Sequence, residues 1–280
     1  MVELHSVHVP VAWRGSICSP RNGAQRDLTI AVSVAIATKS ALVGMSRRLR
    51  CADWVRDPRE KRCCGVMCGR FSLQCSADQL PLPLFDVLPA DHRRHYSPRA
   101  LVSPSEPVLA LVRDEGVQRA ALLLWGLLPS WVKDPTQGPR PINARSETVP
   151  QKPSFRGAWR HRRCLIPATA FFEKRHCFRP SHGGVFWLAG LWERWLGADG
   201  SEVDTCTVLT TSPNVLVEPW HPRMPVLIPE GLEQAWLAPV HGAELQALEA
   251  LFSPWSPAGW IHEGPASRAG HSDVLQGSLF

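Results

Sequence analysis

The chain has 280 residues, of which 44% are apolar and 20% are charged, and this is the composition of an ordinary globular protein. Its 9 cysteines are an odd number without regular spacing, which argues against a disulfide scaffold and favours free thiols in a reducing, cytoplasmic compartment. The net charge of +6 comes entirely from residues 1–66, because basic and acidic residues are equal in number over residues 67–280.

Residues 1–66 differ from the sequence that follows them. Their apolar stretch, Leu28–Met45, is too short and too polar to be a confident membrane span. Its basic surroundings resemble a targeting segment, and a start codon placed too far upstream explains the same pattern. We favour the second explanation and expect a poorly structured, removable extension. Whether translation begins at Met1, Met45 or Met67 stays open.

Beyond the extension, the residue pattern predicts a β-rich α+β fold. One domain is expected over residues 67–255, with short peripheral helices, and a loose Gly-, Pro- and Ser-rich tail over residues 256–280. Apolar runs with β-branched or aromatic residues predict strands at Val108–Arg113, Arg119–Leu124, Cys164–Glu173, Val185–Trp192, Thr205–Thr211 and Met224–Ile228. Pro167 is expected to break the strand over Cys164–Glu173, as a strand end or a bulge. Helices are expected near Ser76–Leu84, Pro229–Leu237 and Ala243–Phe252.

The segment Met67-Cys68-Gly69-Arg70-Phe71 reads like the start of a protein. If Met67 were the initiator and were removed, Cys68 would carry a free α-amine beside its thiol. Such a pair condenses with an aldehyde to an imine, which the thiol closes into a thiazolidine ring. The alternative is that Cys68 is a small buried residue, the usual fate of a free cysteine.

Imine chemistry needs a neutral amine and an acid that protonates the departing oxygen. Glu173 ends an apolar strand, where partial burial would raise its pKa into a useful range, or it is a rim carboxylate paired with a neighbouring base. His221 lies between prolines that fix its backbone, although a histidine in a surface turn fits equally well. Asn143 and Arg145 alternate on an extended segment and can therefore face one side.

Residues 140–179 carry ten basic and two acidic side chains, a local charge of +8 (10 − 2). This charge suits a polyanion such as nucleic acid, or it is a solvated face balanced by acids elsewhere in the fold. Trp131 could stack on bases, whereas Trp125 is expected in the core. Neither of the two Cys/His clusters, at residues 63–68 and 176–182, has zinc-finger spacing, so no metal is expected.

Taken together, these segments resemble the SRAP family of SOS-response-associated, abasic-site-processing proteins. The resemblance covers about residues 67–237 and rests on nine short motifs that occur in the family's order. The motifs are Met67–Phe71, Trp125–Trp131, Asn143–Thr148, Lys152–Arg156, Arg163–Pro167, Phe172–Glu173, Ala189–Trp192, Leu209–Thr211 and His221–Pro225.

The resemblance implies a protein that crosslinks, through an N-terminal Cys68, to the ring-opened aldehyde of an abasic site in single-stranded DNA. The family's active-site residues map to Cys68, Asn143, Glu173 and His221. The resemblance together with the basic stretch assigns DNA contacts to Arg70, Arg145, Trp131, Arg156 and Arg163. We expect a nucleoid-associated monomer that needs no cofactor, metal or membrane.

Two departures and two competing functions accompany this assignment. Lys174 follows Glu173 where the family usually has an aromatic residue, and His95 stands where an asparagine is usual. The family resemblance also implies possible autopeptidase and abasic-site lyase activity, the latter through the imine. The first competitor is a thiol autopeptidase without a role on DNA, in which Cys68 attacks the carbonyl of Met67. The second is a non-covalent single-stranded DNA binder, which would show salt-sensitive binding without preference for abasic DNA.

Overall fold

The larger of two β-sheets closes on itself. In the computed structural model, which describes residues 69–136 and 138–264, β10, β4, β3, β6 and β9 pair in that order, and β9 pairs back with β10. These strands form a closed barrel, and β5, β11 and β12 pair along its edges. The strands of this sheet are β3 (Pro107–Asp114), β4 (Val117–Trp125), β5 (Asn143–Arg145), β6 (Arg163–Ala168), β9 (Phe186–Leu196), β10 (Glu202–Thr211), β11 (Met224–Pro225) and β12 (Leu227–Ile228).

Strand β3 shows how the sequence builds the core. Side chains alternate between the two faces of a strand, and Val108, Ala110 and Val112 pack into one apolar cluster while Leu111 packs into another. Trp125 is 1% exposed and belongs to the first cluster, so its expected core position is confirmed. Both faces of β3 are therefore buried along much of its length, which explains its nearly continuous apolar run.

The smaller sheet has the strand order β13-β8-β7-β1-β2. Its strands are β1 (Arg70–Leu73), β2 (Arg99–Val102), β7 (Ala170–Glu173), β8 (His176–Pro180) and β13 (Trp260–Glu263). The chain crosses between the sheets at Thr169, whose amide donates to the Ser72 carbonyl at 2.7 Å and whose hydroxyl lies 3.0 Å from that of Ser72. The single strand expected over Cys164–Glu173 is therefore wrong: it is two strands in two sheets, and the break is at Thr169 rather than at Pro167.

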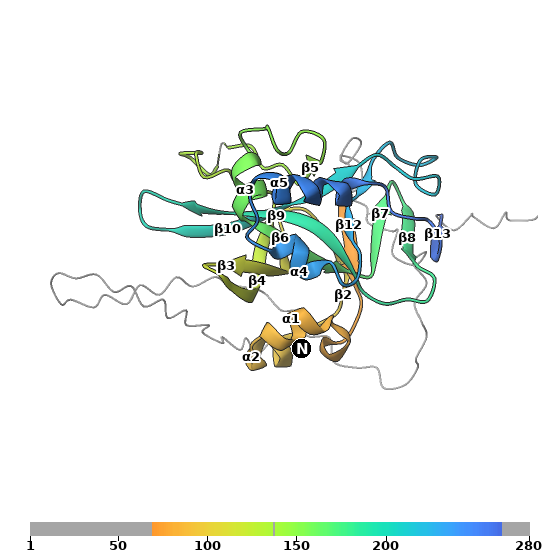
Figure 1. Ribbon diagram of the computed structural model, residues 1–280. Helices are drawn as coiled ribbons and strands as arrows, with labels where there is room; N and C mark the ends of the chain where they lie inside the picture. The colour runs from red at the N-terminus through yellow and green to blue at the C-terminus, as the bar shows by residue number, and fades with distance from the viewer. Residues whose placement is uncertain (1–68, 137, 265–280) are drawn as a thin grey trace, which may run out of the picture. The chain divides into compact units, whose positions relative to one another are not determined.

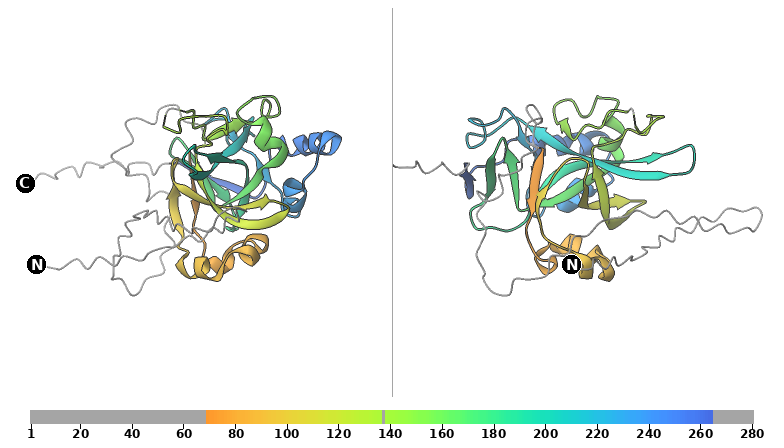
Figure 2. Two further views of the ribbon diagram at one scale, coloured as in Figure 1. Left: turned by 90° about the vertical axis from the view of Figure 1, so that its left-hand side faces the viewer. Right: turned by 180° about the vertical axis from the view of Figure 1, so that it is seen from behind.

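Short helices cover the strands, as the sequence suggested. They are α1 (Leu82–Val87), α2 (Ala90–His95), α3 (Arg156–His161), α4 (Glu233–Leu237), α5 (Gly242–Ala247) and the 3-10 helices η3 (Ala77–Gln79) and η4 (Leu248–Phe252). Figures 1 and 2 show α1 and α2 (orange) and the pair α4 and α5 (blue) on different sides of the strands. Over the described residues, no helix is long and apolar enough to cross a membrane. The β-rich α+β prediction is confirmed, whereas the expected extension, residues 1–66, lies outside the described ranges.

The C-terminal boundary of the fold differs from the expected one. Strand β13 lies in the segment expected to be a loose tail, and it pairs antiparallel with β8 from Trp260 opposite Pro180 to Glu263 opposite Cys177. Trp260 also packs against Phe171 and Trp255, with ring centroids 6.2 and 4.3 Å apart. The folded domain therefore reaches at least Glu263 instead of ending at 255.

Two hairpins turn in two residues, but their sequences differ. Between β3 and β4, Glu115 and Gly116 have φ of 49° and 83°, and glycine suits the positive φ that such turns require. Between β7 and β8, Lys174 and Arg175 have φ of 53° and 121°. Two bulky residues in this region carry strain of about 1–3 kcal/mol each, which the flanking strand pairs must hold.

Candidate active site

Glu173 is a buried carboxylate at the end of a strand. It is the last residue of β7 and is 2% exposed. The neighbouring strand β1 begins at Arg70, which pairs with Phe172 in the antiparallel register. The N-terminal end of β1 therefore lies beside the strand end that carries Glu173. A buried carboxylate is costly unless polar groups lie near it, and the imidazole of His221 is one such group.

The imidazole of His221 faces Glu173. Its Nδ1 lies 3.8 Å from Glu173 Oε2, and the His221 side chain is 11% exposed. The same Nδ1 lies 2.9 Å from the carbonyl oxygen of Arg223. The backbone amide nitrogen of Arg223 lies 3.2 Å from the same Nδ1, so both backbone groups of Arg223 hold this side of the ring. Nε2 is the ring nitrogen outside these contacts, and an imidazole nitrogen can give or accept a proton in catalysis.

Arg223 holds the turn that presents His221. Its guanidinium donates to both carboxylate oxygens of Glu147, at 2.6 and 2.9 Å, and to the carbonyl of Thr210 at 2.5 Å. The hydrogen bonds from Arg223 hold the pKa of Glu147 below its usual value. The sequence patterns indicated no role for Arg223, although it lies within the motif His221–Pro225. A bidentate pair of this kind fixes orientation as well as charge.

Asn143 and Arg145 lie on the same strand edge as this turn. Strand β5 runs parallel to β10, with Asn143 paired to Val208 and Arg145 to Thr210, whose carbonyl Arg223 also binds. Ala144 between them is 1% exposed, so Asn143 and Arg145 occupy the other face of β5. Asn143 is half-buried and Arg145 is exposed to solvent. The end of β10 thus gathers β5 and the His221 turn.

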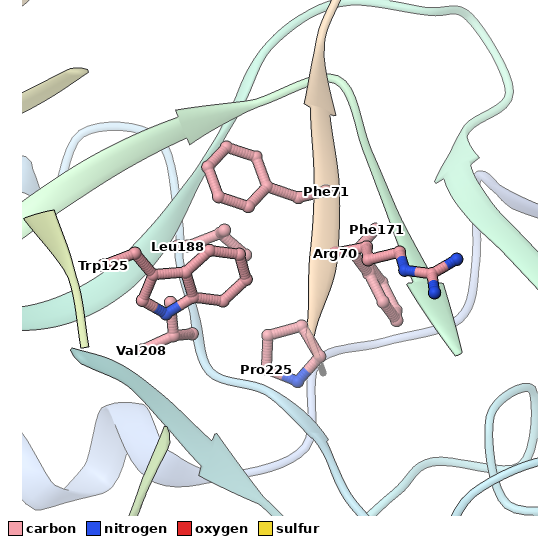
Figure 3. A pocket seen from close by; sticks show the side chains of 7 residues that line it. All are labelled: Arg70, Phe71, Trp125, Phe171, Leu188, Val208 and Pro225. Carbon is pink, nitrogen blue, oxygen red and sulfur yellow. The ribbon is translucent and has the colours of Figure 1, made fainter. Parts of the chain in front are cut away.

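Arg70 stands at the junction of the two sheets. It lines an apolar cavity of about 10 Å³ together with Phe71, Trp125 and Pro225, and this volume leaves room for no more than one water molecule. Figure 3 shows Phe71 pointing toward Trp125 while the Arg70 guanidinium extends to the opposite side of β1. The alternation of β1 therefore buries Phe71 and leaves the charge of Arg70 outside the core.

The basic stretch over residues 140–179 is partly neutralised within the fold. Arg162 pairs with Glu193, and Arg179 pairs with Glu263, each at 2.5 Å. Arg163 is only 4% exposed, and its guanidinium donates to backbone carbonyls. A guanidinium so enclosed cannot reach a phosphate, so the DNA-contact role expected for Arg163 is wrong. The exposed basic side chains of the stretch are Arg140, Arg145, Lys152, Arg156, Arg160, Lys174 and Arg175.

The remaining predicted residues lie in different places. Trp131 is 58% exposed, on the loop after β4 whose Val132 carbonyl accepts a hydrogen bond from the Trp195 indole at 2.6 Å. Arg156 begins α3 and is exposed. His95, in the place of the usual asparagine, ends α2 on the surface, and its Nδ1 lies 2.7 Å from the Asp91 carbonyl oxygen.

Cys68 lies outside the described residues, so the structure does not place the expected nucleophile. Within the described ranges, no group of three or more His, Cys, Asp or Glu side chains is arranged to hold a metal ion.

Comparison with known proteins decides the family. The family model described as SOS response associated peptidase (SRAP) matches residues 67–263. The chain belongs to the SRAP family. Its SRAP relatives include the abasic site processing protein YoqW of Bacillus subtilis, which is 36% identical over 198 residues, covering 68% of this chain and 88% of that protein. The abasic site processing protein YoaM of the same bacterium is 35% identical over 198 residues, covering 68% and 86%.

Solved structures share the SRAP fold with this chain. A Bacteroides thetaiotaomicron protein superimposes with a TM-score of 0.59 at 24% identity, covering 69% of this chain and 90% of that one. A Bordetella bronchiseptica protein superimposes with a TM-score of 0.55 at 23% identity, covering 70% and 98%. The SRAP match ends at residue 263, where β13 ends, and so includes the strand that the sequence patterns missed.

Proposed function

We propose that this protein processes abasic sites in single-stranded DNA by covalent capture through an N-terminal Cys68. The observation that carries the proposal is the buried Glu173 beside His221, at the strand end next to the start of β1. Cys68 precedes Arg70 by two residues, so covalent geometry keeps its Cα within about 7 Å of the Arg70 Cα. The SRAP relatives named as abasic site processing proteins support the same activity.

The proposed crosslinking forms an imine first and a thiazolidine ring second. The neutral α-amine of Cys68 adds to the aldehyde carbon of the ring-opened sugar and forms a carbinolamine, which loses its oxygen as water to leave an imine. The thiol then adds across the imine, so that sulfur bonds to carbon, its proton passes to nitrogen, and a thiazolidine results. Glu173 supplies and removes protons at the departing oxygen and the thiol, and Nε2 of His221 accepts a proton at the sugar oxygen.

The other residues of the site hold the substrate. Asn143 orients the sugar or the cysteine through its amide, while Arg70 and Arg145 bind phosphates. Arg156 and Trp131 extend the contact along the strand through charge and stacking. A free amine is essential to the reaction, so either Met67 is the true start and is removed, or residues 1–67 are cleaved away.

The test uses protein that begins at Cys68 and single-stranded DNA with one abasic site. We expect an adduct that survives denaturing electrophoresis and is absent with Cys68→Ala. An adduct formed at full level by Cys68→Ala would overturn the assignment, as would the absence of an adduct from the unchanged protein.

Self-processing is the second candidate, and the peptidase description of the family model favours it. In this reaction the Cys68 thiol adds to the carbonyl carbon of Met67 and the amide bond to the Cys68 nitrogen breaks, which frees the α-amine and leaves residues 1–67 as a thioester on sulfur. Water then hydrolyses this thioester, which releases residues 1–67 as a carboxylic acid and restores the thiol. Mass spectrometry of the purified full chain distinguishes the two products. A full chain that keeps residues 1–67 and never matures would exclude self-cleavage.

A further inference from the structure

An open cavity of about 410 Å³ lies beside His221, and the proposed crosslinking chemistry makes no use of most of its walls. Its volume falls in the range of ligand pockets, unlike the 10 Å³ cavity at Arg70. Its lining consists of Lys174, Pro213, Glu218, Pro219, Trp220, His221 and Pro222.

Trp220 in this cavity is supported by a stack of rings. Its indole lies on the imidazole of His176, with centroids 3.8 Å apart and planes 25° apart, and His262 lies 4.7 Å away at 27°. His176 Nδ1 and His262 Nε2 are joined by a 2.7 Å hydrogen bond. His262 in turn stacks at 5.0 Å on Phe178, which is fully buried. The half-buried indole is therefore held in one orientation by groups that reach into the core.

The backbone beneath Trp220 is equally well held. The side-chain oxygen of Asn214 accepts hydrogen bonds from the amides of Leu216 and Val217, both at 3.1 Å. The carbonyl of Val217 then accepts from the amides of Trp220 and His221, at 2.9 and 3.0 Å. Trp220 and His221 thus belong to one rigid turn, and a ligand on the indole is fixed relative to the imidazole. Such preorganisation lowers the cost of binding.

The strained hairpin contributes Lys174 to the lining of the cavity. Lys174 has a φ of 53°, and the pairing of Glu173 with His176 on either side of the turn holds it there. Strained backbone conformations persist only where the surrounding structure holds them, and they are concentrated at active sites and ligand-binding sites. Lys174 is exposed, lines the cavity and directly follows the buried Glu173 in the sequence. Glu218, the acidic side chain of the lining, disfavours a phosphate inside it.

An aromatic plane, apolar prolines and one external cation match an unpaired base attached to its phosphate, because every base has a π-face that can stack. We propose that this cavity binds the nucleobase adjacent to the abasic sugar, stacked on Trp220, with Lys174 on the connecting phosphate. The inference rests on the proposed function and adds to it a subsite that positions the sugar beside His221.

The experiment measures binding of the full chain to labelled single-stranded DNA by fluorescence anisotropy. Four oligonucleotides carry a tetrahydrofuran abasic analogue. The first oligonucleotide has a base on both sides of the analogue. In the second the 5′ neighbour, in the third the 3′ neighbour, and in the fourth both neighbours are replaced by further tetrahydrofuran residues, which carry no base. We expect loss of one particular neighbouring base to raise Kd by about 5- to 100-fold, the range that base–aromatic stacking supports.

Two variants test whether the base stacks on the ring of Trp220, and both replace the indole with another large apolar side chain. Trp220→Phe keeps a ring and should keep the preference for the neighbouring base, whereas Trp220→Leu should bind all four oligonucleotides as weakly as the wild type binds the one that lacks that base. Equal binding of all four by the wild type, or a preference retained by Trp220→Leu, would overturn the subsite and leave covalent capture standing. No binding to any oligonucleotide, by the full chain or by protein that begins at Cys68, would count against the proposed function itself.

Discussion

Replacing Arg163 by methionine should destabilise the fold and leave its affinity for DNA unchanged. The guanidinium donates to the carbonyls of Trp236 (2.7 Å), Trp159 (2.6 Å), Arg160 (3.3 Å) and Ala238. These carbonyls lie at the C-terminal ends of α3 and α4, where a positive charge is favourable. Arg163 is the first residue of β6, and its hydrogen bonds connect this strand to the C-terminal ends of both helices.

The size of the effect follows from these contacts. Hydrogen bonds to a charged group contribute about 1.5–3 kcal/mol each and are not additive. Methionine fills much of the space but leaves the carbonyls buried without donors, so we expect the free energy of unfolding to fall by about 3–5 kcal/mol. For a domain of this size, the melting temperature should fall by about 6–20 °C.

Thermal unfolding followed by circular dichroism measures the change, and Arg156→Met is the matched control. Arg156 is exposed at the start of α3, so its replacement should alter stability by no more than about 0.5 kcal/mol but weaken DNA binding. Arg163→Met, assayed well below its melting temperature, should bind single-stranded DNA like the wild type. Equal melting temperatures for the two variants would refute this reasoning, as would a loss of DNA affinity in folded Arg163→Met.

Three further predictions concern the site and its surroundings. Glu173→Gln keeps the shape of the side chain but removes its acid–base function, so adduct formation should slow by about 10²- to 10⁴-fold; an unchanged single-turnover rate would contradict the role. Arg175→Gly relieves a φ of 121° and should raise the free energy of unfolding by about 1 kcal/mol; an unchanged or lower urea midpoint would contradict the strain. Burial lowers the pKa of His176 and of His262 below the usual 6.5, so the unfolded chain binds more protons just below that pH. Stability should therefore be complete above pH 6.5 and decline as the pH falls toward 5, and unfolding curves of His262→Phe should show a shallower decline.

The parts of the fold that local sequence determines were predictable. The β3–β4 hairpin has apolar strands joined by Glu115-Gly116, and glycine at a positive φ is a local signal. The crossing at Thr169 was not predictable, because it depends on hydrogen bonds to Ser72, far away in the sequence. Strand β13 is only four residues long and lies in a Gly-, Pro- and Ser-rich segment, so its own sequence gives a weak strand signal, and it forms because the edge of β8 is available to pair with it.

The site divides in the same way. Glu173 and His221 were singled out by their local sequence and by motifs that occur in a family order, but their 3.8 Å approach depends on how distant segments of the fold meet. Arg163 was misjudged because a count of charges carries no information about burial. The contacts of Trp220 with His176 and His262 bring together three distant segments, and no spacing rule joins them.

Strand β10 pairs with β4, β5, β9 and β11, and the candidate site lies around its C-terminal end. Its other end turns back to β9 through residues 197–201, at the tip of the long hairpin that projects from the barrel in Figure 1. The candidate site and the projecting hairpin tip therefore lie at opposite ends of the same strand. A reporter domain or fluorophore inserted at that tip would leave the pairing around Asn143 and His221 intact, so the hairpin is the natural position for a probe that follows the protein on DNA.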